Sequence, residues 1–83
     1  MTDCYFTFRS ITKAQSGERA LHRERIRYAL LRTPKKLSLQ GCGYALKVPY
    51  GEAGAAAAAL RLWNVDYGKI YRVTGGEMEE IVL

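Results

Sequence analysis

The sequence has few of the residues that build metal centres or disulfide scaffolds. Among 83 residues it contains two cysteines, Cys4 and Cys42, and one histidine, His22. A zinc site needs closely spaced ligands such as a Cys-x-x-Cys pair, and a small disulfide-built domain needs more than one pair of cysteines. We therefore expect no metal site and no disulfide framework. A Cys-His catalytic pair would depend on His22 alone.

Common enzyme motifs are missing as well. Gly41 and Gly43 lead into a strand-like segment and not into a helix, so they do not form a phosphate-binding loop. Serine and threonine residues form no triad, and paired carboxylates occur only near the end of the chain. We therefore expect no hydrolase, kinase or glycosidase activity and no cofactor. At most, the chain would act as a thiol group-carrier and not as an enzyme.

Long apolar runs are absent too. The longest stretch, residues 48–60, is rich in alanine, is interrupted by Glu52 and falls short of the ~20 residues that span a bilayer. The opening residues Met1–Asp3 are acidic and continue into a strand-like segment, which does not resemble a signal peptide. These features predict a cytoplasmic chain.

Composition favours one folded unit. Hydrophobic residues make up 48% and charged residues 25%, which is typical of a globular domain. We expect a single α/β sandwich domain over residues 1–73. Residues 74–83, with three glutamates, form an acidic tail or an extra edge strand.

The net charge of +5 is unevenly distributed. More than half of the basic residues lie in one short segment: Arg19, Arg23, Arg25, Arg27, Arg32, Lys35 and Lys36. Such a segment favours anionic partners, which include RNA, phosphates and acidic protein surfaces. The simpler interpretation is a solvated helix face followed by a loop.

Four segments are typical of strands. Residues 4–9 alternate strictly, with Cys4, Phe6 and Phe8 on the face that we expect to be buried. The other predicted strands span residues 27–32, 44–48 and 67–73. Thr33-Pro34 closes the second, because the residue before a proline avoids helical geometry, and Pro49 ends the third.

Two segments are typical of helices. Ser10 is a candidate N-cap for a helix over residues 11–23, whose apolar stripe includes Ile11, Ala14, Gly17 and Leu21. Glycine costs about 1 kcal/mol relative to alanine in a helix, so Gly17 suggests a close approach to a sheet. A second, alanine-rich helix spans residues 52–63. Its predicted inward residues are Ala53, Ala56, Leu60 and Trp63, and Asn64 follows as a left-handed cap.

The order β-α-β-β-α-β predicts a ferredoxin-like α+β fold. In this two-layer sandwich, a four-stranded antiparallel sheet has strands one and three in its centre and carries both helices on one face. A different ordering of the same elements in a two-layer or three-layer sandwich is the alternative.

Gly41-Cys42-Gly43 is the most informative candidate site. We expect Cys42 at the end of the sheet where the first helix begins, near Ser10 and Arg9, with Lys35 and Lys36 in the same loop. A helix N-terminus and nearby cations lower the pKa of a thiol from its free value of about 8.5. Cys42 is thus a candidate thiolate nucleophile, although a free cysteine is more often a small buried apolar residue.

Cys4 has the opposite prediction. It alternates with Phe6 and Phe8, so we expect it in the core. The strand geometry separates it from Cys42 by about 15 Å, which argues against a disulfide between them.

The chain resembles a small bacterial family of selenium/sulfur carrier-like proteins. The resemblance covers about residues 4–73. It rests on the opening strand 5–8 followed by Ser10, the Thr33-Pro34 step, the segment 67–73 and, most specifically, the Cys-Gly-Tyr-Ala-Leu-Lys-Val stretch over residues 42–48. Where the family often has serines before the cysteine, this chain has Leu39-Gln40-Gly41. The resemblance implies that Cys42 accepts sulfur or selenium from one protein and passes it to another. Basic residues around it (Arg9, Lys35 and Lys36) would dock an acidic donor or acceptor.

The alternative function is a binding or regulatory module that uses the uncovered face of the sheet. This face would carry Tyr5, Thr7, Arg9, Ala45 and Lys47, together with either Ile70 or Tyr71. Aromatic and basic residues on an open sheet can stack RNA bases, but the specific RNA-recognition signature is missing. A homodimer or another protein partner is therefore favoured over RNA.

Overall fold

The computed structural model of the chain describes residues 1–35 and 43–83. Strands and helices alternate in the predicted order, and a further strand follows: β1 (Thr2–Phe8), α1 (Ile11–Arg23), β2 (Ala29–Arg32), β3 (Tyr44–Pro49), a 3-10 turn (Tyr50–Glu52), α2 (Ala53–Leu62), β4 (Ile70–Thr74) and β5 (Glu77–Ile81). In the described part of the chain, no helix is long and apolar enough to span a membrane.

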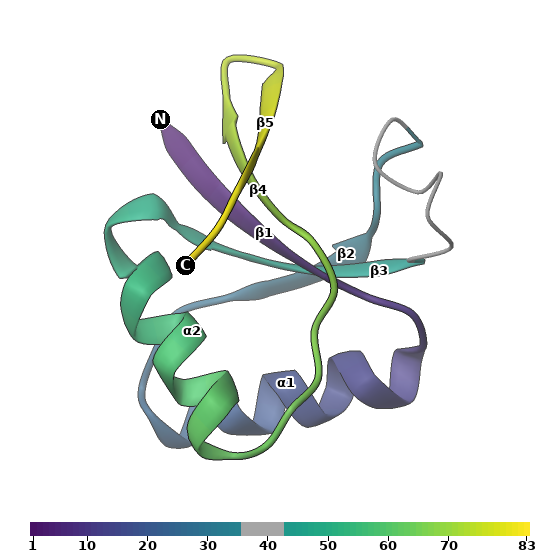
Figure 1. Ribbon diagram of the computed structural model, residues 1–83, viewed down its shortest axis with the longest axis vertical. Coiled ribbons are helices and arrows are strands. Elements are labelled where there is room, and N and C mark those ends of the chain that lie inside the picture. Colours follow the sequence, from purple (N-terminus) through teal and green to yellow (C-terminus); the bar gives the residue numbers. More distant parts are fainter. Residues whose placement is uncertain (36–42) are drawn as a thin grey trace.

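The strands form one antiparallel sheet in the order β2-β3-β1-β4-β5. Figure 1 shows α1 and α2 together on one side of this sheet. β1 and β3 both lie inside the sheet, as predicted, and Phe8 at the end of β1 pairs with Tyr44 at the start of β3. The sheet has five strands and not four, because β5 pairs with β4. This fifth strand lies in residues 74–83, for which an acidic tail or an extra edge strand was expected.

The core lies between the sheet and the two helices. Cys4, Phe6 and Phe8 are at most 1% exposed, which confirms the alternation predicted for the first strand. Leu46 and Val48 on β3 extend this face, and both are fully buried. From the helices, the core receives mainly small residues and two leucines: Ala14, Ala20, Leu21, Ala53, Ala56, Ala57, Ala59 and Leu60.

Gly17 lies where α1 comes closest to the sheet. A Cβ atom built on Gly17 would stand 2.8 Å from Leu46 Cδ1 and 2.9 Å from Phe8 Cζ. Real Cβ atoms do not approach other atoms so closely, so a side chain at this position would push the helix away from the sheet. The prediction of a close approach at Gly17 is confirmed.

Two residues of the predicted helix stripes are not buried. Ile11 opens α1 and is 37% exposed. Trp63 is 43% exposed, because α2 ends at Leu62 and Trp63 serves as its C-cap. The indole Nε1 of Trp63 donates a hydrogen bond to Glu24 Oε2 at 3.3 Å, so its polar edge is directed to the end of α1. The left-handed conformation predicted for Asn64 is confirmed by its φ of 54°.

Two strands are shorter than predicted. β2 begins at Ala29 and not at Arg27, because the pairing register would set Arg27 opposite Pro49, which has no N–H to donate. β4 begins at Ile70 and not at Tyr67. Gly68 N donates to Thr7 O, and Thr7 N donates to Lys69 O. Gly68 and Lys69 therefore both face the single residue Thr7, as in a β-bulge.

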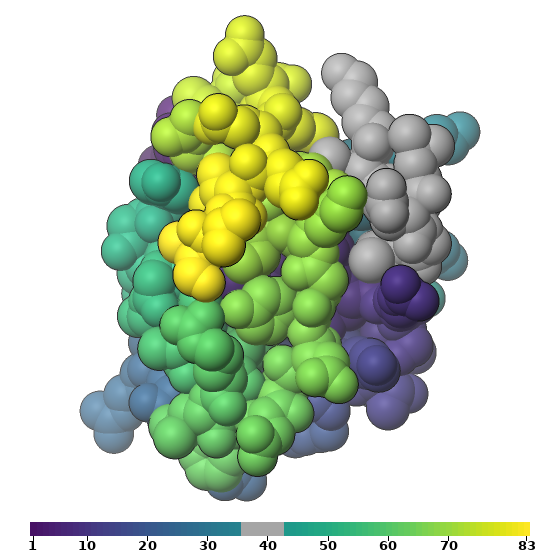
Figure 2. All heavy atoms as spheres, viewed as in Figure 1, coloured from purple at the N-terminus to yellow at the C-terminus, as the bar shows by residue number. Residues whose placement is uncertain are grey.

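β4 and β5 form a tight hairpin. Its two connecting residues, Gly75 and Gly76, have φ values of 55° and 88°, which suit the type I′ turns that glycine favours. The end of the chain then returns to α2, where Arg61 Nη1 donates to the carbonyl oxygen of Leu83 at 3.3 Å. Figure 2 shows this C-terminal segment lying across the surface beside β4 and α2.

The face of the sheet away from the helices is only partly open. Tyr5 and Lys47 are half-buried there, whereas Thr7 and Ala45 are at most 1% exposed, contrary to the prediction of an uncovered face. The open choice between Ile70 and Tyr71 is resolved. Ile70 belongs to the core, and Tyr71 lies beside Tyr5 on the second face.

Candidate functional site

Three chain segments meet at one end of the sheet. β1 ends at Phe8, β3 begins at Tyr44, and these two residues pair directly. Gly43, which follows Cys42 in the sequence, accepts a hydrogen bond at its carbonyl oxygen from Thr33 N at 3.1 Å. The residues that flank the segment 36–42 are thus held at the end of the sheet where α1 begins.

Ser10 starts α1 as the sequence predicted. Its backbone is extended, with φ of −137° and ψ of 158°, and its Oγ accepts a hydrogen bond from Lys13 N at 3.2 Å. The first turn of α1 contains no acidic residue. The positive end of the helix dipole is therefore not neutralised by a carboxylate in that turn, which favours an anion nearby.

Cationic side chains surround the same end of the sheet. Arg9 and Lys13 are exposed and line a hollow of about 210 Å³ with Asp66, Tyr67 and Gly68. Lys35, which follows β2, is exposed. The guanidinium of Arg32, the last residue of β2, lies 5.3 Å from the centre of the Tyr44 ring. Arg9 and Ser10 follow the end of β1, and Lys35 follows the end of β2 at the same end of the sheet.

Three of the predicted site residues, Lys36, Gly41 and Cys42, lie outside the described residues. Gly43 is described and half-buried, and a Cβ built on it would meet nothing within 4 Å. Crowding therefore does not require glycine at position 43.

Cys4 lies in the core and has no access to solvent. It is 0% exposed, pairs with Val48 on one side and Arg72 on the other, and belongs to the cluster that contains Phe6 and Leu60. Burial raises the pKa of its thiol from 9.0 to about 12, because the core does not solvate a thiolate. Its burial confirms the sequence prediction for Cys4.

His22 and most of the basic cluster lie elsewhere. His22 is exposed in the last turn of α1, so the length of that helix separates it from Ser10. Arg19 and Arg23 lie on the same helix, and Arg23 stacks on Trp63 with its Cζ 4.7 Å from the ring centre. Arg27 forms an exposed ion pair with Glu52 at 3.5 Å. The run of basic residues in the sequence is therefore not one surface at the candidate site.

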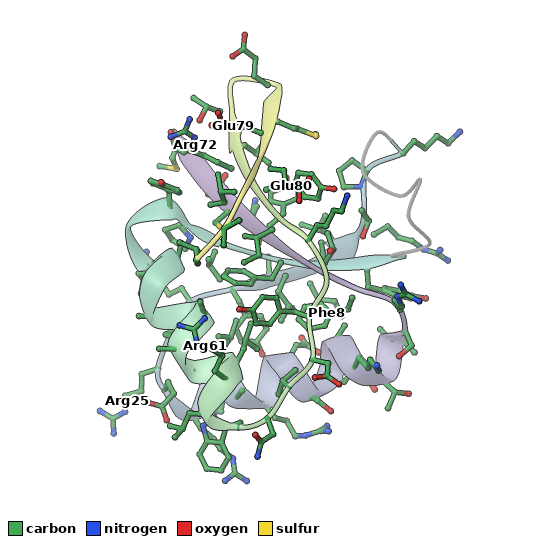
Figure 3. The ribbon with its side chains drawn as sticks, in the orientation of Figure 1. Phe8, Arg25, Arg61, Arg72, Glu79 and Glu80 are labelled. Carbon is green, nitrogen blue, oxygen red and sulfur yellow. The ribbon has the colours of Figure 1, made fainter. Side chains whose placement is uncertain are left out.

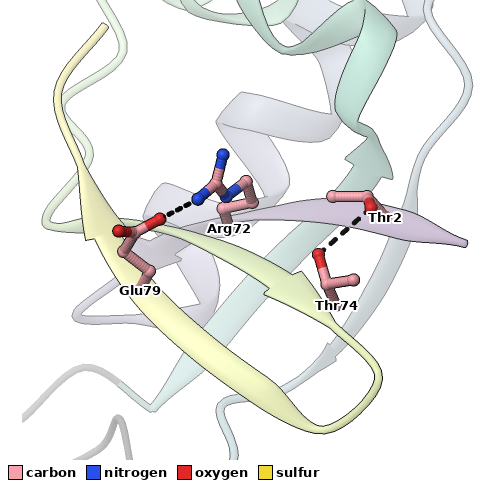
Figure 4. A network of polar contacts seen from close by, with 4 residues as sticks. All are labelled: Thr2, Arg72, Thr74 and Glu79. Carbon is pink, nitrogen blue, oxygen red and sulfur yellow. Dashed lines mark hydrogen bonds and ion pairs between the residues drawn. The ribbon is translucent and has the colours of Figure 1, made fainter.

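The sequence interpretation missed a polar hollow under the β4–β5 hairpin. Arg72 forms an ion pair with Glu79, and Thr74 Oγ1 donates to Thr2 Oγ1 at 3.1 Å (Figure 4). These residues and Tyr50 line a hollow of about 470 Å³. The two-residue Gly75-Gly76 turn could have indicated the pairing, since it fixes Arg72 opposite Glu79.

Comparison with known proteins gives one match. A family model described as "Putative Se/S carrier protein-like" matches residues 3–72. No curated protein and no solved structure matches the chain.

Proposed function

The chain belongs to the Se/S carrier protein-like family, and from this premise we propose that it carries a sulfur or selenium atom on the thiol of Cys42. The family match covers most of the chain and agrees with the resemblance seen in the sequence. A carrier of this type needs a nucleophilic thiolate that partner proteins can reach.

The burial of Cys4 is the observation that carries this proposal. The sequence has only two cysteines. Cys4 is fully buried, and its pKa of about 12 leaves it protonated at neutral pH, so it has neither the access nor the charge that a carrier thiol needs. If the chain carries the atom on a cysteine, Cys42 is the remaining one.

The described neighbours of the segment 36–42 support a low thiol pKa at this end of the sheet. The start of α1 has no carboxylate in its first turn, Arg9 directly precedes Ser10, and Lys35 is exposed after β2 at the same end of the strands. Both the helix dipole and the cations favour a thiolate over a thiol. The same positive groups, together with Lys36, would attract an acidic donor or acceptor protein.

The transfer requires no external oxidant. The Cys42 thiolate attacks the outer sulfur of a persulfide on the donor protein. One S–S bond forms on Cys42 as the S–S bond of the donor breaks, and the donor leaves as a thiolate. An acceptor thiolate would take the outer sulfur from Cys42 by the same exchange, and a donor loaded with selenium would transfer selenium in its place.

Intact-mass measurement tests this function. The protein is incubated with a cysteine desulfurase and cysteine, and its mass is recorded before and after treatment with a thiol reductant. We expect wild-type protein to gain the mass of sulfur, which the reductant removes. Cys42→Ser should gain none, and the matched variant Cys4→Ala should still gain it. An unlabelled wild type, or equal labelling of Cys42→Ser, would contradict the proposal.

A further inference from the structure

A row of four side chains crosses the sheet on the face away from the helices. Lys47 on β3 pairs with Tyr5 on β1, Tyr5 pairs with Tyr71 on β4, and Tyr71 pairs with Glu80 on β5. Paired residues on neighbouring strands point to the same face. Since Cys4 and Phe6 point into the core, Tyr5 and its row point away from it. We call these four residues the tyrosine row.

The residues on the opposite side of the β4–β5 hairpin confirm that Tyr71 and Glu80 point away from the helices. Arg72 and Glu79 alternate with Tyr71 and Glu80 along their strands and pair with each other on the helix side. Figure 3 shows Arg72 and Glu79 on one side of the hairpin and Glu80 on the other. Glu79 is therefore a matched control for Glu80, one residue away and on the other face.

The tyrosine row has opposite charges at its two ends. Lys47 and Glu80 lie three strands apart, which is about 14 Å at the usual strand spacing of ~4.8 Å. Two half-buried tyrosines lie between them. The neighbouring row consists of Pro49, Asp3, Val73 and Met78, all half-buried, so the centre of the face is apolar and aromatic apart from the carboxylate of Asp3.

We propose that a second copy of this chain packs on the tyrosine row, about a two-fold axis that runs parallel to the strands between β1 and β4. A half-turn about this axis reverses the order of the strands. Lys47 of one copy then faces Glu80 of the other, and Tyr5 faces Tyr71. Every charged end of the row meets the opposite charge, so the row is complementary to itself, as an isologous dimer interface requires.

The charge of this face favours a second copy over other partners. Lys47 and Lys69 on the face are balanced by Asp3 and Glu80, and Arg27 at its edge is balanced by its ion-pair partner Glu52. A face with no net charge lacks the positive potential that RNA binding needs, and it has no preference for an acidic protein. Lys69 forms an ion pair with Glu80 at 3.6 Å within one copy, but both side chains are about half exposed. Exposed pairs of this kind are weak, so Glu80 can change partners at low cost.

A standard interface sets the area that this face would have to supply. It covers about 800 Å² on each partner, which is roughly 15% of the 5205 Å² surface of this chain. The proposal is independent of the chemistry of Cys42.

Charge exchange tests the proposed interface. Molecular mass is measured by sedimentation equilibrium from micromolar to millimolar protein for wild type, Lys47→Glu, Glu80→Lys, the double variant and Glu79→Lys. We expect wild type to dimerise. Each single change in the row sets like charges against each other and should weaken the dimer at least about tenfold. The double variant should restore it, and Glu79→Lys on the other face should not affect it.

Several results would overturn the proposal. A wild type that is monomeric at all concentrations has no such interface, whether or not it binds single-stranded RNA. A dimer that neither single variant weakens uses another surface. Failure of the double variant to recover the affinity, while thermal melts show that it is folded, would mean that Lys47 and Glu80 do not meet.

Discussion

Replacing Gly17 by alanine sets two known effects against each other. Alanine is favoured over glycine in a helix by about 1 kcal/mol, so propensity alone predicts a more stable protein. The new methyl group, however, would lie 2.8 Å from Leu46 Cδ1 and 2.9 Å from Phe8 Cζ. Both of these side chains are at most 1% exposed, so neither can swing into solvent to make room.

The clash should decide the result. Adding a methyl group to a packed core costs about 1–3 kcal/mol, which exceeds the gain in helix propensity. We expect Gly17→Ala to lower the free energy of unfolding by about 1 kcal/mol. For a domain of this size, that corresponds to a fall in Tm of about 4–8 °C.

Gly54 in α2 provides the matched control. It is exposed, and a Cβ built on it would meet nothing within 4 Å. Gly54→Ala therefore keeps the gain in propensity without the clash, and we expect it to raise the stability by about 0.5–1 kcal/mol. Thermal and denaturant unfolding of the two variants should give opposite signs. If Gly17→Ala were as stable as wild type or more so, the close packing of α1 on the sheet would be refuted.

Two further predictions concern the thiols. Burial raises the pKa of the Cys4 thiol from 9.0 to about 12, so as the pH rises the thiol loses its proton in the unfolded state before it does so in the folded state. The contribution of this thiol to the free energy of unfolding should therefore be full below pH 9 and fall between pH 9 and 12. Denaturant unfolding across this range should show the free energy of unfolding of wild type falling by up to about 1.4 kcal/mol per pH unit more than that of Cys4→Ala. If the two proteins showed the same dependence of stability on pH, the assigned burial of Cys4 would be contradicted. In the native protein, Cys42 should react with iodoacetamide much faster than Cys4, with a pH midpoint below about 8.5 that rises modestly in Lys35→Gln/Lys36→Gln. Comparable rates, or a midpoint above that value, would indicate a structural thiol.

The parts of the fold predicted from sequence depend on local chemistry. Strict alternation in residues 4–9 identified the buried face of β1, and Ser10 identified the start of α1. Gly17 indicated a close approach because a glycine within a helix has an energetic cost that packing must offset. Asn64 indicated a left-handed residue for a similar reason, since few residues accept that conformation.

The parts that were missed depend on pairing partners far away in the sequence. The alternation of residues 27–32 does not reveal that Pro49 would face Arg27, which ends the pairing of β2. The burial of Thr7 and Ala45 likewise cannot be obtained from their own strands. Trp63 matched the spacing of the buried stripe, but α2 ends one residue earlier and the indole bonds to Glu24 instead.

The prediction for the candidate site likewise has one part that depends on a local pattern and one part that depends on distant segments. The sequence correctly assigned Cys4 to the core, because alternation with two phenylalanines is a local pattern. The reactivity of Cys42 depends on groups from three separate segments, around Arg9, Lys35 and Gly43, and remains a proposal that chemistry must test.

The most direct test is to locate the transferred sulfur within wild-type protein. After loading by a cysteine desulfurase and cysteine, accessible thiols and persulfides are alkylated, the protein is digested, and the peptides that contain Cys42 and Cys4 are analysed by mass spectrometry. We predict an additional sulfur on the Cys42 peptide, lost on reduction and on incubation with an acceptor thiol, and none on the Cys4 peptide. Sulfur on Cys4, or on neither peptide, would contradict the proposal that Cys42 is the carrier.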